Sequence, residues 1–264
     1  MSRRALVPLS IAVLCGALAA TASAQQPLPK EPIPPVTEAD REAAFPQGLD
    51  GHAVHDRRIN YFVLFDQLEW QSGSGRGLNL DNTTWIGGDI DRVWLRGEMD
   101  ADEGRVDHAS VHALWGHSIS RWWDVVAGVR QDFRPGDPRT MAAVGIQGLA
   151  PYWFDVQATA YVGGGGRTSV RLEAEYDMLL TNRLIAQPLV EIELHGKTDP
   201  ARQIGAGLST IETGVRVRYE FRRELAPYIG VTWSRKTFGT ADFARAVGED
   251  PSRVRMTVGL RTWF

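Results

Sequence analysis

Two stretches of this chain, residues 169–178 and 212–221, alternate apolar and charged side chains. In the first, Leu172 shares one side with other apolar residues, whereas Arg171 and Glu173 lie on the opposite side. Side chains of a strand alternate with a period of two, so each stretch has one apolar and one charged face. A soluble antiparallel sheet also alternates. Many such stretches without a hydrophobic helix are typical of a transmembrane β-barrel, which is apolar outside and polar inside.

Residues 1–24 have the features of a secretory signal peptide. Two early arginines precede an apolar stretch at 11–20, and the small-residue site Ala22-Ser23-Ala24 follows it. We therefore expect cleavage after residue 24. The single cysteine, Cys15, lies within this segment, so the mature chain is expected to contain neither disulfides nor cysteine metal sites.

The average composition of the chain does not reveal whether it forms a transmembrane β-barrel. The mean hydropathy is −0.23 and charged residues make up 23% of the chain. After the signal there is no apolar run of about 18 residues, the length of a membrane helix. A barrel places its apolar side chains at every second position, so an average does not reveal it. The net charge of −3 argues against a nucleic-acid partner.

The mature chain is expected to have two parts. Residues 25–56 are rich in proline, which predicts an extended or disordered periplasmic arm. Residues 57–264 are expected to form an all-β, transmembrane antiparallel barrel. The predicted strands are 58–70, 82–88, 92–99, 106–117, 122–132, 141–149, 153–162, 168–180, 183–195, 210–222, 228–236 and 253–264.

The predicted connections alternate between long and tight. With a periplasmic C-terminus, every long loop falls on the outer side, as in bacterial outer-membrane barrels. A break at Gly88-Asp89 gives an even count of twelve strands, and ten or fourteen stay open as alternatives. The long loops are predicted at 71–80, 134–139, 163–167, 196–208 and 239–252, and the tight turns near 118–120, 150–151, 181–182 and 223–227.

Aromatic residues gather near the predicted periplasmic ends of the strands, where an interfacial girdle would place them. They are Trp122, Trp123, Tyr152, Trp153, Phe154, Tyr228, Trp263 and Phe264. In the last strand, Val254, Met256, Val258, Leu260, Thr262 and Phe264 share one face. This pattern, closing on an aromatic residue, is similar to the C-terminal signature of outer-membrane proteins.

Charged side chains of both signs are predicted on the inner face. They suit either a cation-binding wall or selective conduit, or a plug of ion pairs that fills a narrow barrel. The principal predicted lumen charges are Arg171, Glu173, Glu175, Glu191, Glu193, Arg216 and Arg218. Others are Arg130, Arg222, Arg255, Arg261, Asp124, Asp155, Asp177, Glu212 and Glu220.

Histidines are the candidate metal ligands, because imidazole suits Cu(II) and Zn(II). His52 and His55, with Asp56 adjacent, precede the first predicted strand. His108 and His112 are four residues apart in one strand and therefore share a face. Two others, His117 on the opposite face and His195 at a strand end, complete the set.

No catalytic motif is present, and we expect no enzymatic activity. A membrane-embedded hydrolase would need a serine, a histidine and an acid near one rim. Ser110 and His112 share a face, but the sequence assigns them no third partner.

The chain contains long strings of mixed residue types, which are more specific than any short motif. They include G-H-A-V-H-D at 51–56, F-D-Q-L-E-W at 65–70, W-I-G-G-D-I-D-R-V-W-L at 85–95 and R-L-E-A-E-Y-D-M-L-L-T-N-R-L at 171–184. These strings resemble the copper resistance protein B family of bacterial outer-membrane barrels. The resemblance covers residues 35–264 and implies a barrel that binds copper ions, or sequesters or helps export them. Many members carry a tail rich in Met and His, but this chain has no Met between Gln25 and Asp56.

The resemblance leaves His52 and His55 as the best residual copper ligands. It implies copper ions, outer-membrane lipid and periplasmic copper-handling proteins as partners, with Cu(I) and Cu(II) both open. The alternative function is a general outer-membrane pore for another cation or small solute. Copper should bind at imidazole sites, whereas a general pore should conduct with little metal preference.

Overall fold

The computed structural model describes residues 35–44, 58–72 and 76–264. The chain divides into two compact units, Met1–Val54 and His55–Phe264. The described part of the first unit contains helix α1, Glu38–Ala44. Thr37 caps it, since its hydroxyl accepts from the Asp40 amide at 3.2 Å while Asp40 Oδ2 accepts from the Thr37 amide at 2.8 Å. Over these seven residues the predicted extended or disordered arm is helical instead.

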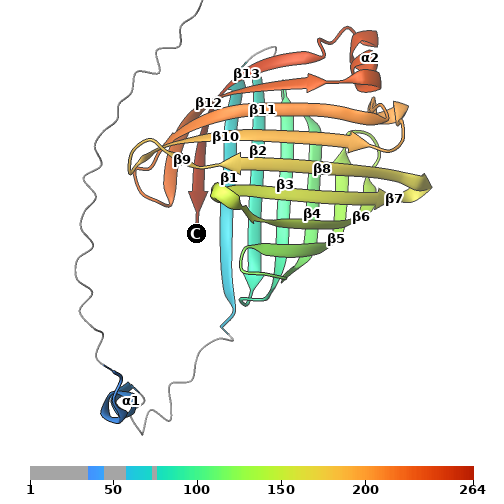
Figure 1. Ribbon diagram of the computed structural model, residues 1–264. Coiled ribbons are helices and arrows are strands. Elements are labelled where there is room, and N and C mark those ends of the chain that lie inside the picture. Colours follow the sequence, from blue (N-terminus) through green and yellow to red (C-terminus); the bar gives the residue numbers. More distant parts are fainter. Residues whose placement is uncertain (1–34, 45–57, 73–75) are drawn as a thin grey trace, which may run out of the picture. The chain divides into compact units, whose positions relative to one another are not determined.

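The second unit is a closed antiparallel β-barrel (Figure 1). It has thirteen strand segments, but β9 continues β8 along the same edge of β10, so the barrel has twelve strands as predicted. The segments are β1 Asn60–Ser72, β2 Arg76–Gly87, β3 Asp91–Asp102, β4 Arg105–Ser118, β5 Trp123–Arg134, β6 Arg139–Ala150, β7 Phe154–Gly163, β8 Arg167–Tyr176, β9 Met178–Leu179, β10 Leu184–His195, β11 Gly207–Tyr219, β12 Leu225–Lys236 and β13 Ser252–Trp263.

The first and last strands close the barrel. β1 pairs with β13, with Leu64 opposite Trp263, and on its other edge with β2. Phe264 extends this closure, because its amide donates to the Val63 carbonyl at 2.9 Å and its carbonyl accepts from the Val63 amide at 3.1 Å. Closure leaves no unpaired sheet edge, which a strand structure in lipid requires.

The predicted break between the second and third strands is confirmed. β2 ends at Gly87 and β3 begins at Asp91. Gly87 has φ +158°, and a Cβ there would lie 2.3 Å from the carbonyl oxygen of Asp91. Only glycine fits this turn without displacing the backbone of the next strand.

The barrel has two different ends. The short-turn end holds the turns at 88–90, 119–122, 151–153, 180–183 and 220–224, and β9 marks it in Figure 1. The long-loop end holds the two longest loops, 196–206 and 237–251. Two short 3₁₀ turns, Pro151–Trp153 and Gly164–Gly166, lie at opposite ends, and a third, Pro200–Arg202, lies within the loop 196–206.

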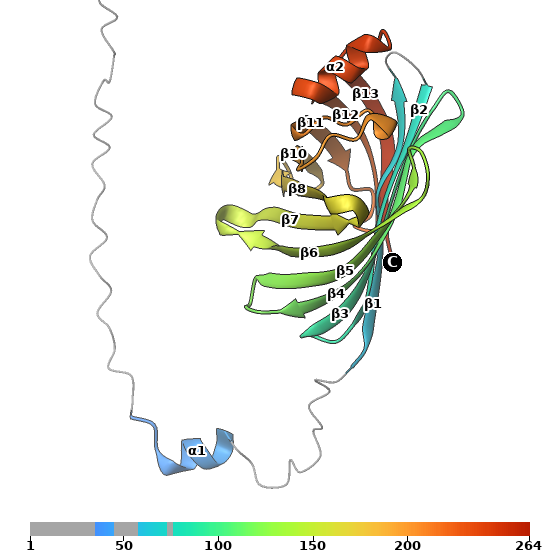
Figure 2. The ribbon, with the colours of Figure 1, turned by 90° about the vertical axis from the view of Figure 1, so that its right-hand side faces the viewer.

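Two of the predicted long loops are partly regular structure. Residues 76–80 belong to β2, and their glycine and asparagine content obscured the alternation. Within 239–252 the chain forms most of helix α2, Phe238–Ala246, which lies beside β11 and β12 (Figure 2). Thr240 anchors α2, since its hydroxyl accepts from the Gly205 amide at 2.9 Å. None of the helices in the described ranges has the length and apolar content needed to cross a membrane.

The two faces of the barrel wall follow the predicted alternation. Leu172 is 40% exposed and Met256 is 66% exposed, whereas Arg216, Arg218 and Thr257 on the inner face are 4%, 4% and 1% exposed. An apolar cluster fills part of the interior beside β4–β7. Its buried members are Leu114, Val126, Met141, Ala143 and Tyr161.

Several of the predicted girdle aromatics are exposed at the short-turn end. Tyr152, Trp153 and Phe264 are 83%, 64% and 68% exposed, and Trp153 also lines the mouth of an internal cavity together with Trp122. The girdle assignment is wrong for Tyr228, because it is 4% exposed and its hydroxyl donates to Glu69 Oε1 at 3.0 Å. Tyr228 therefore belongs to the lumen.

A charge introduced on the outer face should destabilise the barrel more than one on the inner face. We expect Leu172→Arg to lower the free energy of unfolding by roughly 2–4 kcal/mol, the cost of an arginine at the bilayer midplane. Gln157→Arg on the neighbouring strand is the matched control, because Gln157 lines an internal cavity. Urea unfolding in lipid vesicles measures both. Equal losses would contradict the assignment of faces.

Candidate functional site in the barrel lumen

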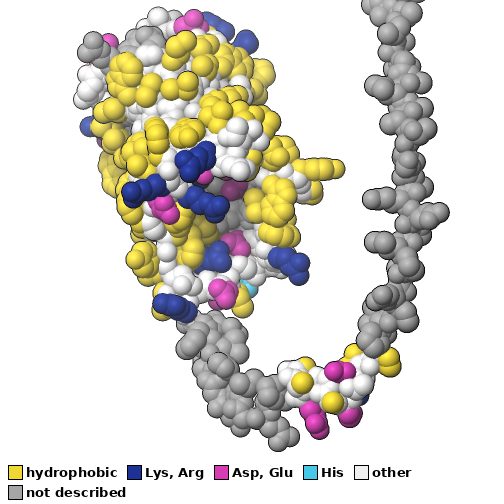
Figure 3. All heavy atoms as spheres, turned by 90° about the vertical axis from the view of Figure 1, so that its left-hand side faces the viewer, with side chains coloured by type: hydrophobic (Ala, Val, Ile, Leu, Met, Phe, Trp, Pro, Cys, Tyr) yellow, Lys and Arg dark blue, Asp and Glu magenta, His cyan; other side chains and the backbone are white. Residues whose placement is uncertain are grey.

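A large and a small cavity lie in the lumen between the described strands. The large cavity, of about 800 Å³, reaches the short-turn end, where Ser120, Trp122 and Trp153 line it. The small cavity, of about 110 Å³, lies at the long-loop end, where Lys197 and Arg202 line it. Figure 3, seen from the side of the β8–β10 turn, shows acidic and basic side chains gathered around a hollow with hydrophobic flanks.

Arg171 separates the two cavities. Of the residues that the structure describes, Arg171 and Tyr161 are the two that line both cavities. Arg171 on β8 donates from Nη1 to Glu98 Oε1 on β3 at 2.6 Å, and from Nη2 to Glu191 Oε2 on β10 at 2.9 Å. Its Nη2 also lies 3.7 Å from Glu173 Oε2. Because β4, β5, β6 and β7 lie between β3 and β8, the bond to Glu98 crosses the lumen. We call Glu98, Arg171, Glu173 and Glu191 the waist.

The predicted histidine pair lies on either side of the waist. His108 lines the small cavity, and its Nε2 lies 3.7 Å from Glu98 Oε2. His112 lines the large cavity, is 2% exposed, and packs edge-on against Tyr161 with 5.7 Å between ring centroids. Among the described residues, neither ring nitrogen of His112 has a hydrogen-bond partner. The two histidines share a face of β4 as predicted, and the structure shows that this is the inner face.

No ready metal centre occurs in residues 35–44, 58–72 and 76–264, because no three His, Cys, Asp or Glu side chains there are placed to hold one ion. The predicted ligands His52, His55 and Asp56 lie outside the described residues. His117 is on the outer face as predicted, with Nδ1 2.9 Å from Asp91 Oδ1.

The two cavities differ in the balance of charge. Nine acidic and five basic side chains line the large cavity, whereas three acidic and six basic ones line the small cavity. The acidic residues of the large cavity are Asp66, Asp81, Asp89, Glu98, Asp124, Asp155, Glu173, Glu175 and Asp177, and the basic ones are Arg92, Arg96, Arg121, Arg171 and Arg261. Those of the small cavity are Asp132, Glu193 and Asp199 against Arg130, Arg139, Arg167, Arg171, Lys197 and Arg202.

Carboxylates also lie directly opposite one another in the strand register. Glu173 on β8 is opposite Glu191 on β10, and Glu191 is opposite Glu212 on β11. Asp155 and Glu175 face each other in the same way across β7 and β8. Like charges directly opposite in an antiparallel pair are destabilising. This wall therefore requires positive charge, and Arg171 supplies it at the waist.

Other luminal pairs fill the side of the barrel near β11 and β1. Arg216 donates from Nε to Glu69 Oε1 at 2.6 Å, and Arg218 donates from Nη1 to Asp177 Oδ1 at 2.9 Å. Both arginines were predicted in the lumen. Arg222 was also predicted there, wrongly, because β11 ends at Tyr219 and Arg222 is exposed in the following turn.

Sequence reasoning missed several luminal acids, among them Asp66, Glu69, Asp81 and Glu98. Their signal was the alternation within the first three strands. It is weaker there because β1 contains a register shift and β2 is rich in polar residues. The strand that carries Glu98 was predicted, but Glu98 was not assigned to the inner face of the barrel.

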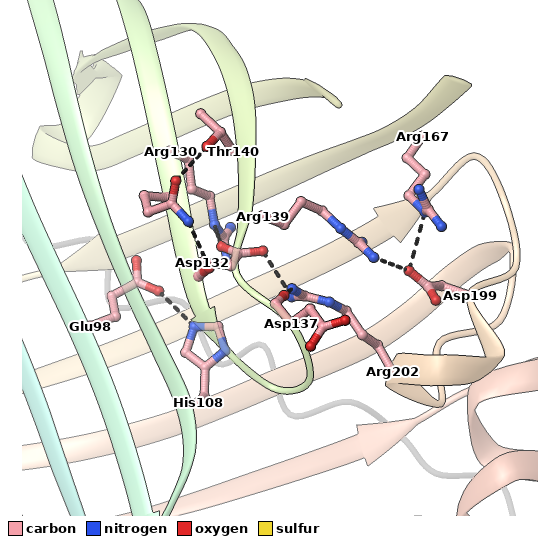
Figure 4. Close-up of polar contacts among 11 residues, drawn as sticks. Glu98, His108, Arg130, Asp132, Asp137, Arg139, Thr140, Arg167, Asp199 and Arg202 are labelled. Atoms are coloured by element: carbon pink, nitrogen blue, oxygen red, sulfur yellow. Dashed lines mark hydrogen bonds and ion pairs between the residues drawn. The ribbon is translucent and has the colours of Figure 1, made fainter. Parts of the chain in front are cut away.

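The loop 196–206, here called the mouth loop, is fastened to the opposite wall by ion pairs (Figure 4). Arg202, 9% exposed, donates to Asp132 Oδ2 at 3.1 Å and to the Asp137 carbonyl at 2.8 Å. Asp199 accepts from Arg139 at 2.7 Å and lies 3.3 Å from Arg167 Nε. Burial would raise the pKa of Asp199, but the Arg139 hydrogen bond and the surrounding arginine charges hold that pKa below its usual value.

Comparisons with known proteins agree with this picture. The family model of "Copper resistance protein B precursor (CopB)" matches residues 59–264. The copper resistance protein B homolog of Pseudomonas syringae pv. tomato is 53% identical over 236 residues, which is 89% of this chain and 80% of that protein. Copper resistance protein B of Escherichia coli is 51% identical over 236 residues, 89% of this chain and 79% of that protein.

Among solved structures, the NanC porin aligns with a TM-score of 0.51 and 12% identity, covering 77% of this chain and 99% of that chain. At this identity the likeness concerns the fold. A closed wall that is apolar outside and charged inside, together with this likeness, defines a β-barrel protein of the bacterial outer membrane. The chain belongs to the copper resistance protein B family, and its broad role is copper resistance.

The mouth loop should loosen when Asp199 loses its charge. We expect Asp199→Asn to increase amide hydrogen exchange across 196–206, because Arg139 and Arg167 lose their carboxylate partner. Asp242→Asn, which breaks the exposed pair with Arg245 on α2, should leave that exchange unchanged. Equal exchange in wild type and Asp199→Asn would show that these ion pairs do not hold the loop.

Acid should release the mouth loop only at low pH. Because the folded-state pKa of Asp199 is below the ordinary value of 3.8, its contribution is fully present above that value and is lost as pH falls through the lowered pKa. Exchange protection in 196–206, corrected for intrinsic rates, should therefore be equal at about pH 7 and pH 5. A loss of protection between those two pH values would contradict this account.

Proposed function

We propose that the barrel binds copper ions in the large cavity and so sequesters them at the outer membrane, without catalysing a reaction. The observation that carries this proposal is the excess of acidic over basic side chains in a cavity that ends at the waist. A cleft lined by one sign of charge raises the local concentration of the opposite ion. Cations entering at the short-turn end are therefore attracted and retained.

Imidazole and carboxylate groups are the proposed ligands. His112 lines the large cavity, and its ring nitrogens have no hydrogen-bond partner among the described residues, while His108 lies beyond the waist. Both groups suit Cu(II). His52, His55 and Asp56 remain proposed as a second site, at a junction that precedes β1 by a few residues. β1 starts at the short-turn end, since Asn60 is opposite Gly87.

The proposal also assigns a role to each of three segments of the chain. Residues 1–24 serve as the signal peptide, 25–56 as the periplasmic arm, and 57–264 as the barrel. With the short-turn end toward the periplasm, periplasmic copper-handling proteins deliver the ion to the large cavity. Export through an open lumen is the less favoured alternative, because the waist and the mouth loop both lie in the path.

Copper titration of the full-length barrel tests the proposal. We expect wild type to bind Cu(II), and His108→Ala with His112→Ala to bind it more weakly while still folding. His52→Ala with His55→Ala tests the second site, where binding should weaken as pH falls through about 6.5, since imidazole coordinates when neutral. His117→Ala, on the outer face, is the matched control.

Calorimetry or quenching of tryptophan fluorescence measures these affinities. Wild type that binds no copper would refute the proposed function. Copper binding that is the same in both double variants and wild type would show that neither histidine pair supplies a ligand, and would move the site to the carboxylates.

A further inference from the structure

At the waist, three carboxylates surround one guanidinium. Arg171 lies 2.6 Å from Glu98, 2.9 Å from Glu191 and 3.7 Å from Glu173, measured between the nearest nitrogen and oxygen atoms. The four side chains are 16–21% exposed, so water screens them only in part. Three carboxylates around one positive charge is the arrangement of a cation-binding site, and here the cation is the Arg171 guanidinium.

The strand register explains why a cation is needed there. Glu173 and Glu191 are direct neighbours across β8 and β10, and Glu212 follows Glu191 across β11. Directly opposed residues lie about 4.5–5.5 Å apart between Cβ atoms, where like charges destabilise the sheet, so a counterion between these carboxylates is stabilising. The backbone thus creates the site, and the Arg171 side chain fills it.

A second observation points to a ligand other than Arg171. His112 is 2% exposed and lines the large cavity together with Glu98 and Arg171. Both of its ring nitrogens lack a hydrogen-bond partner within the described part of the chain, an arrangement that costs free energy in a buried polar group. An imidazole nitrogen is a preferred ligand of divalent transition metals.

We propose that the waist is a cation-exchange site, in which a divalent transition-metal ion from the large cavity replaces the Arg171 guanidinium on Glu98, Glu173 and Glu191, with His112 as nitrogen ligand. The inference rests on the proposed function, because it needs cations in the large cavity. No three His, Cys, Asp or Glu side chains in the described part of the chain form a ready set, so the side chains at the waist must move to take up the metal.

The proposal gives the waist a second role. The same guanidinium that competes with the metal also separates the two cavities. The metal then bridges Glu98 on β3 and Glu173 on β8 in place of the Arg171 guanidinium, so the lumen stays divided while the metal is bound. Metal and Arg171 exclude each other at the carboxylates, so removal of Arg171 strengthens metal binding.

Arg171→Gln in the full-length barrel tests the site, with Cu(II) as the probe. Compared with wild type, we expect a Cu(II) affinity roughly tenfold or more higher. We also expect a larger potassium conductance in planar bilayers and block of that conductance by Cu(II). Adding His112→Ala should reverse the gain in affinity but keep the conductance. Arg216→Gln, which removes another buried luminal arginine, should change neither property.

Faster migration of unheated protein in detergent gels verifies that each variant is folded. If Arg171→Gln does not fold, Arg171→Lys replaces it, since lysine keeps the charge but lacks the planar fork that reaches Glu98 and Glu191 together. For Arg171→Lys we expect a smaller increase in Cu(II) affinity and a smaller increase in potassium conductance. Unchanged Cu(II) affinity or unchanged conductance in the folded variant would overturn the proposal.

The experiment also separates this inference from the proposed function. If wild type binds no Cu(II) but Arg171→Gln binds it and conducts, the waist site stands and the proposed function fails. If wild type binds Cu(II) and Arg171→Gln binds it no more tightly, the proposed function stands and the waist site is wrong.

Discussion

The ion pair between Arg171 and Glu98 is the interaction on which the interior of this barrel depends. It spans the lumen from β8 to β3, and with the second bond to Glu191 it ties three strands together. Placing charges in a poorly solvated interior is costly unless each is paired and hydrogen-bonded. Loss of Arg171 would leave Glu98, Glu173 and Glu191 without their shared cation. The pair therefore divides the lumen and at the same time permits the acidic wall of β8, β10 and β11 to exist.

Division of the lumen gives each end a different character. The large cavity carries an excess of acidic side chains and reaches the short-turn end, while the small cavity carries an excess of arginine and lysine beneath the mouth loop. In the proposed function, a cation that enters the large cavity would meet first the waist and then a region of opposite potential. This order of charges supports the proposed retention of cations over their passage through the barrel.

The alternation of Arg171, Glu173 and Glu175 predicted the strands and the inner face, because a period of two depends on local geometry alone. Which residue Arg171 meets across the lumen could not be predicted, since that depends on the stagger of strands far apart in the sequence. Tyr228 was misplaced for a similar reason. It points inward over Gly259, where a Cβ would lie 2.5 Å from its ring, and only the β12–β13 register reveals that space. Helix α2 was missed because its buried face is formed by contacts with the mouth loop and β11.

A double-mutant cycle on the lumen-spanning pair tests the central claim most directly. The free energy of unfolding would be measured for wild type, Glu98→Gln, Arg171→Gln and the double variant. Because the two side chains are in direct contact, the account predicts that the double variant loses less stability than the sum of the single losses, by about 1–3 kcal/mol. Additive losses, within about 0.3–0.5 kcal/mol, would contradict it.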